Sequence, residues 1–237
     1  MYKINDKDTD VPIERVDTIR YLGILIDEKL SFKEHIHEKI NKAYRMLGLI
    51  KRNFKYLTTE SFTLLYKNMV RSQLDYCSSV WSPYRKGDIE TLEKVQKKAT
   101  KILPQFKNLK YEDRLRACKL PTLYFRRIRV DMIETFKIVT GIYDIVVSPN
   151  MLAAGPSYAT RGHDLILQKI RARYDLRKYY FTNRVVNMWN SPSSYVVSAE
   201  SVNCFKNRLD NFWKNQQIIC NFRAEIYGTG NRSEVPV

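Results

Sequence analysis

Apolar residues recur at alternating steps of three and four along residues 32–50, and this spacing predicts an amphipathic helix. Ahead of it, β-branched and aromatic residues cluster over residues 19–26, which predicts a strand or a hairpin interrupted at Gly23. Ser31 and Glu34 have the spacing of a capping box, in which each side chain satisfies a free backbone N–H of the first helical turn. We therefore expect a short β segment followed by a helix that begins near Ser31.

Four further helices are predicted by the same 3.6-residue period. Pro83 and Gly87 interrupt the pattern, and Pro104 closes the helix that follows them. Thr122 is a candidate N-cap and Gly141 a stop signal for the last of the four. The expected helices cover residues 59–80, 88–103, 111–120 and 123–139.

The composition changes after Tyr143. Residues 145–160 contain two prolines, one glycine and no charged residue, which indicates a linker. Beyond it we expect a short strand over 165–171, helical structure over 176–189 and a last helix from Ser198. The fold class is mainly α, and the expected segments are a β remnant (1–30), a helical domain (31–142), a linker (143–160), a smaller α(+β) C-terminal unit (161–220) and a flexible tail (221–237).

The charge balance indicates a polyanionic partner. The 237 residues include 41 Lys and Arg against 25 Asp and Glu, which gives a formal net charge of +16 and a pI near 9.6. A surface this cationic attracts nucleic acid before any specific contact forms. No segment approaches the roughly 18 to 20 apolar residues of a membrane span, and the N-terminus lacks the pattern of a signal peptide. We therefore expect no membrane partner and an intracellular location, in the nucleus or the cytoplasm.

Basic residues gather in three places. Eight Lys or Arg and two Glu lie between Lys29 and Lys55, four lysines line one face of the helix over 88–103, and three arginines begin the helix over 123–139. Neighbouring like charges repel by a few tenths of a kcal/mol per pair unless an anion lies between them. An ordinary solvated lysine surface is the alternative interpretation. The candidate nucleic-acid-binding residues are Lys39, Lys42, Lys51, Arg52, Lys94, Lys97, Lys98, Lys101, Arg126 and Arg127, with Tyr56 and Tyr84 as candidate stacking rings.

No catalytic constellation is evident in the sequence. It contains no phosphate-binding glycine loop and no adjacent Asp-Asp pair, and its four cysteines lack metal-knuckle spacing. We interpret His35, His37 and His163 as solvated, because no nucleophile motif accompanies them. The residues themselves therefore argue against an autonomous enzyme and indicate no cofactor.

The order of several segments resembles a known family. The sequence VDTIRYLGILIDEKLSF at 16–32 is followed by LLYKNMVRSQLDYCSSVWSPY at 64–84 and IETLEKVQKKATKIL at 89–103. TRGHDLIL at 160–167 and NRVVNMWNS at 183–191 continue the pattern. This order resembles the C-terminal part of the reverse transcriptase of jockey-like LINE (non-LTR) retrotransposons, namely the end of the palm, the thumb and the region that follows. A departure is Pro192-Ser193-Ser194, where relatives tend to continue with Leu-Pro.

The resemblance carries its own implications. It implies that residues 31–103 form a thumb that closes over an RNA–DNA duplex, and that Tyr21, Leu22, Gly23 and Ile24 form a primer-grip-like turn. It also implies that the catalytic aspartate pair and its Mg²⁺ belong to a palm missing from this chain, so that the chain alone is inactive as an RNA-directed DNA polymerase. We therefore expect a fragment that binds nucleic-acid backbone without sequence specificity and self-associates through its N-terminal strand. The alternatives are a helical protein-interaction module and a truncated pseudogene product without a function.

Overall fold

The computed structural model describes residues 3–6, 9–12, 15–144, 146–151, 153 and 165–227, and the expected mainly helical fold is confirmed. The N-terminal part consists of two separate antiparallel hairpins. The first pairs β1 (Lys3–Asp6) with β2 (Thr9–Pro12), and the second pairs β3 (Thr18–Tyr21) with β4 (Ile24–Asp27). The β segment that the sequence predicts is therefore present as short hairpins.

The second hairpin turns at Leu22 and Gly23. Tyr21 pairs with Ile24, and the two loop residues have left-handed φ values of 46° and 79°, the combination typical of a type I′ turn. Tyr76, far along the chain, holds this turn. Its hydroxyl donates to the Leu22 carbonyl over 2.9 Å, and its ring lies 3.7 Å from where a Cβ on Gly23 would stand.

The helix α1 (Lys33–Asn53) follows the predicted apolar stripe, but the predicted capping box at its start is wrong. Asp27 takes the place of that box. Its carboxylate accepts from the Ser31 hydroxyl over 2.6 Å and from the Phe32 N–H over 2.9 Å. The N-cap position is occupied by Phe32, with a left-handed φ of 54°, so the Ser31 side chain does not cap the helix.

The single helix expected over 59–80 is divided into four pieces. α2 (Thr59–Leu65) continues as the π-helical turn η1 (Tyr66–Arg71) and then as α3 (Ser72–Asp75), and α4 (Ser78–Trp81) follows after a break. The break lies at Cys77, whose φ is 50°. An apolar period cannot reveal such a break, because both sides keep their buried faces.

The next helices agree with the predicted ranges to within a few residues. They are α5 (Lys86–Thr100), α6 (Tyr111–Cys118) and α7 (Leu123–Val139), with the 3₁₀ turn η2 (Pro104–Phe106) between the first two. Thr122 caps α7 as predicted, since its hydroxyl oxygen accepts from the Phe125 N–H over 3.2 Å. Gly141 follows α7 with a φ of 71°.

The C-terminal helices are shorter than expected. The predicted stretch over 176–189 forms α8 (Asp175–Lys178), α9 (Phe181–Arg184) and α10 (Val186–Trp189). α11 (Ser194–Val197) precedes α12 (Val202–Phe212), which begins after a Ser201 cap rather than at Ser198, and the 3₁₀ turn η4 (Gln217–Ile219) follows. The strand expected over 165–171 is a single bridge from Leu167 to Ala153.

Two predicted irregular segments are described only in part. Residues 145, 152 and 154–160 of the predicted linker lie outside the described residues, as do His163 and residues 228–237 of the predicted tail. Residues 221–227 do not fray. Ile226 is buried, and Arg223 reaches Glu90 on α5 over 2.9 Å.

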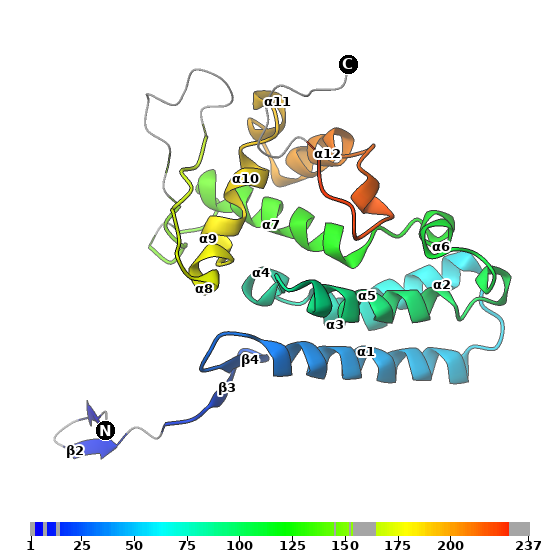
Figure 1. Ribbon diagram of the computed structural model, residues 1–237, viewed down its shortest axis with the longest axis horizontal. Helices are drawn as coiled ribbons and strands as arrows, with labels where there is room; N and C mark the ends of the chain where they lie inside the picture. The colour runs from blue at the N-terminus through cyan, green and yellow to red at the C-terminus, as the bar shows by residue number, and fades with distance from the viewer. Residues whose placement is uncertain are drawn as a thin grey trace.

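The buried side chains form two clusters that meet at the start of α7. The first runs from α1 to Leu123, and the second runs from Phe125 on α7 through α10 and α12 to Ile226. The buried side chains of α7 from Phe125 onward therefore belong to the second cluster, with those of the C-terminal helices. Figure 1 shows the resulting layers, with α1 on the outside, α5 and its neighbours next, then α7, and α10 to α12 beyond it.

Candidate nucleic-acid interface

The lysines of α5 divide into an exposed set and a packed one. Lys94, Lys98 and Lys101 are exposed, and among the described residues no carboxylate lies within ion-pairing distance of any of them. Lys98 rests its ammonium 4.7 Å from the ring centre of Tyr44 on α1. Lys97 is half-buried, with its ammonium 4.6 Å from the ring centre of Phe222. The exposed lysines can meet an anion, whereas Lys97 has a packing role as well as a charge.

The basic residues of α1 have unequal roles. Lys51 and Arg52 are exposed at the end of the helix. Lys42 is half-buried, and its ammonium lies 2.6 Å from the carboxylate of Glu38. The same carboxylate pairs with the Arg20 guanidinium over 2.8 Å. Hydrogen bonds from Arg20 and Lys42 lower the pKa of Glu38 to about 2. Lys42 therefore already pairs with a carboxylate of the protein, which it shares with Arg20.

The prediction that Lys39 is free to meet phosphates is wrong. Only 6% of the residue is exposed, and its ammonium lies 5.2 Å from the ring centre of Tyr76. Burial, together with the nearby Lys42, lowers the pKa of Lys39. Lys39 lies at the edge of the apolar stripe of α1, where the segment after α3 covers its long aliphatic stem.

Arg126 and Arg127 are used inside the fold and do not form part of an anion-binding surface. Arg126 donates to Asp75 of α3 over 2.8 and 3.0 Å. Arg127 is 2% exposed, lies 5.3 Å from the Trp81 ring centre and faces the Leu74 carbonyl. Burial lowers the pKa of Arg127. The third basic cluster therefore joins α7 to α3 and α4.

The predicted solvation of His35 is also wrong. Its Nδ1 accepts from the Leu25 N–H of β4 over 3.1 Å, and its ring packs against Trp81 with the centres 5.2 Å apart. Burial and the nearby Lys39 lower the pKa of His35 to about 4. A neutral His35 thus connects the β3–β4 hairpin to α1 and α4. These contacts give His35 a structural role.

The primer-grip-like residues occupy the hairpin turn. Tyr21 and Leu22 are 63% and 72% exposed, whereas Ile24 is buried. Together with Ile19, which is 54% exposed, they give the hairpin an apolar surface that no described residue covers. The turn is therefore positioned firmly by Tyr76, and its side chains remain available.

A basic and aromatic segment that the sequence analysis did not identify lies around α8. Its exposed residues include five basic side chains against one acidic side chain, Asp175. We call its exposed basic residues and tyrosines the α8 strip: Lys169, Arg171, Arg173, Tyr174, Arg177, Lys178 and Tyr180. The density of basic residues beside tyrosines could have revealed it.

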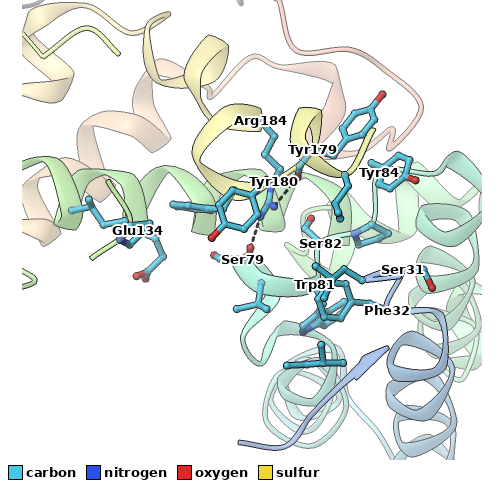
Figure 2. Close-up of a pocket in the computed structure, with 18 of the residues that line it drawn as sticks. Ser31, Phe32, Ser79, Trp81, Ser82, Tyr84, Glu134, Tyr179, Tyr180 and Arg184 are labelled. Atoms are coloured by element: carbon cyan, nitrogen blue, oxygen red, sulfur yellow. Dashed lines mark hydrogen bonds between the residues drawn. The ribbon is translucent and has the colours of Figure 1, made fainter. Parts of the chain in front are cut away.

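A cavity of about 600 Å³ adjoins the α8 strip. Aromatic rings line much of its wall, and Figure 2 shows Tyr84 and Tyr179 at one end and Glu134 at the other. Tyr84 stacks on Tyr179 with ring centres 4.2 Å apart and an angle of 7°. The other candidate stacking ring, Tyr56, is 96% exposed in the loop after α1.

Two further findings concern metal binding and membrane-spanning helices. Within the described ranges, no three His, Cys, Asp or Glu side chains gather into a group that could hold a metal ion. In the same ranges, no helix is long and apolar enough to pass through a bilayer.

Comparison with known proteins gives one weak similarity. A search found no matching protein-family model, and no solved structure matches the chain. An uncharacterised protein of Caenorhabditis elegans is 29% identical over 126 residues, which are 52% of this chain. The match covers 63% of that relative's length. The relative's name states no activity, so the functional argument rests on the residues themselves.

Proposed function

We propose that this chain binds the backbone of a nucleic-acid duplex through the exposed basic residues of α5 and the end of α1. The observation that supports this most directly is the set of three exposed lysines without carboxylate partners, Lys94, Lys98 and Lys101. Lys51 and Arg52 are exposed on the neighbouring helix α1. Phosphate contacts of this kind position a protein on a duplex and carry no sequence information.

The segment order adds a more specific proposal. The chain is the thumb-like and following part of an RNA-directed DNA polymerase from a non-LTR retrotransposon, and its duplex is an RNA–DNA hybrid. The hairpin turn at Leu22 and Gly23 is well placed to guide a strand, since Tyr76 holds it rigidly while Tyr21 stays exposed. In this proposal the catalytic aspartates and Mg²⁺ belong to a separate palm.

The test measures binding of a labelled 20-base-pair RNA–DNA hybrid by fluorescence anisotropy between low and physiological salt. Each phosphate contact contributes roughly 0.9 to the slope of log K against log salt. The variant Lys94→Gln/Lys98→Gln/Lys101→Gln keeps helix propensity, so we expect its slope to shrink by about two to three units, with weaker binding for all sequences alike.

A matched control removes the same charge elsewhere. Lys67, Lys119 and Lys214 are exposed in η1, after α6 and after α12. Their replacement by Gln should leave the slope within about one unit of the original. Equal effects of the two variants would mean that only net charge matters, and the proposed interface would be wrong.

The exposed hairpin supports a second candidate function, association with a protein surface or with a second copy. Ile19, Tyr21 and Leu22 are each more than half exposed on one short hairpin. Exposed apolar patches beside unpaired strand edges commonly mark interaction surfaces. Sedimentation velocity of the purified chain over a concentration series tests this candidate.

A further inference from the structure

The α8 strip combines charge with exposed rings in a way that the α5 face does not. Lys169, Arg171 and Arg173 are exposed, whereas the intervening Ile170 and Ala172 are half-buried. This alternation places the three basic side chains on the exposed side of the segment. Among the described residues, no carboxylate lies within ion-pairing distance of the strip's basic side chains.

The rings of the strip stand in the open. Tyr174 is 78% exposed and Tyr180 is 58% exposed, and neither phenol has a hydrogen-bond partner among the described residues. Tyr180 also lines the aromatic cavity, whose volume of about 600 Å³ lies within the range of ligand pockets. Exposed rings beside basic side chains can stack on the bases of a nucleic acid.

Buried polar contacts hold the strip in place. The Asn183 side chain accepts from the Ile170 N–H over 3.1 Å and so fixes the extended part of the strip against α9. Arg184 donates to the carbonyls of Tyr179 and Ser79 over 3.3 and 2.6 Å and pairs with Asp131 over 3.0 Å, as Figure 2 shows in part. The strip is therefore a preorganised surface.

The cavity wall carries charges of both signs, so the positive charge that can attract a polyanion belongs to the strip itself. The carboxylates of the cavity wall are Asp88, Glu134 and Asp144. Glu134 is bound by Lys137 and Tyr143, away from the strip at the other end of the cavity. Beside the strip, Arg85 lies 5.6 Å from the ring centre of Tyr84 and within the field of Asp88 and Asp175.

We propose that the α8 strip and the aromatic mouth beside it bind single-stranded nucleic acid, with phosphates on the basic side chains and bases stacked on Tyr174 and Tyr180. Proteins that hold single strands combine these two features, a basic track and aromatic platforms. A duplex cannot use the platforms, because its bases are already stacked and paired. The inference goes beyond the proposed duplex binding and does not depend on it.

The experiment compares one variant on single-stranded and duplex probes. Fluorescence anisotropy measures the affinity of the full chain for labelled 20-nucleotide oligo(U) and oligo(dT), and for the RNA–DNA hybrid, at one salt concentration. Base stacking on an aromatic ring contributes enough per base that we expect Tyr174→Ala/Tyr180→Ala to weaken single-strand binding by about 10-fold or more. Hybrid binding should change by less than about two-fold.

A control variant removes two equally exposed rings elsewhere. Tyr195 and Tyr227 are 67% and 62% exposed, and Tyr195→Ala/Tyr227→Ala should leave both affinities unchanged. Circular dichroism checks that every variant is folded. We expect each to fold, because the substituted tyrosines are exposed. Equal losses on both probes, or no loss on either, would overturn the inference and leave a protein partner as the occupant of the strip. If the unmodified chain binds single strands but does not bind the hybrid, only the proposed duplex-binding function is refuted.

Discussion

Acidification should loosen the contact between the hairpin and the helical bundle through His35. The folded-state pKa of His35 is about 4, because of burial and the charge of Lys39, against an ordinary value of 6.5. Between these two values the unfolded chain binds a proton that the folded chain does not. The stability associated with neutral His35 is therefore complete above pH 6.5 and is lost as the pH falls toward 4.

The magnitude follows from the shift. Going from pH 7 to pH 5 would cost about 2 kcal/mol for a shift of this size. We expect about 1 to 2 kcal/mol, because solvent near the helix surface screens the charge. Protonation also removes the Nδ1 acceptor of the Leu25 N–H, so the hairpin should loosen first.

The assay is urea unfolding at pH 7 and pH 5, followed by circular dichroism, with an NMR titration of the histidine ring protons. His35→Phe should be less stable at pH 7 but should lose about 1 to 2 kcal/mol less than the original chain on acidification. His37→Gln, which replaces an exposed histidine on the same helix, is the control and should behave like the original chain. A His35 ring that titrates near 6.5, or the same pH dependence for His35→Phe, would refute the reasoning.

Three further predictions test the packing. Asp131→Asn leaves the half-buried Arg184 without its carboxylate and should lower the free energy of unfolding by about 3 kcal/mol, measured by thermal unfolding. Asp210→Asn breaks the more exposed pair with Arg129 and should lower it by less than about 1 kcal/mol. Gly23→Ala should cost about 1 kcal/mol because of its φ of 79°, whereas Gly48→Ala, exposed within α1 with no atom nearby, should stabilise by about 0.5 to 1 kcal/mol. Ile19→Thr/Tyr21→Thr should reduce any self-association in sedimentation velocity without lowering the melting temperature, and unchanged association would exclude the hairpin as the contact.

The local pattern determined most of the helical framework. The stripes of α1, α5 and α7 were visible because a helix that buries one face must repeat its apolar residues every 3.6 positions. The hairpin at Gly23 and the Thr122 cap were visible because a tight turn and a helix cap each require particular residue types at neighbouring positions. The starts of α1 and α12 were misplaced, since Asp27 and Ser201 compete with the predicted serines.

Tertiary structure decided which basic residues are available. The 3.6-residue repeat of apolar residues shows which face of a helix is apolar. It does not show which neighbouring segment covers the residues at the edge of that face. Lys39 and Arg127 were therefore expected at the surface, and both are buried because long aliphatic stems can pack while their charged ends find rings or carbonyls. The place of Tyr84 beside Tyr179 was equally hidden, because 94 residues separate two rings that only the packing of α8 and α9 brings together.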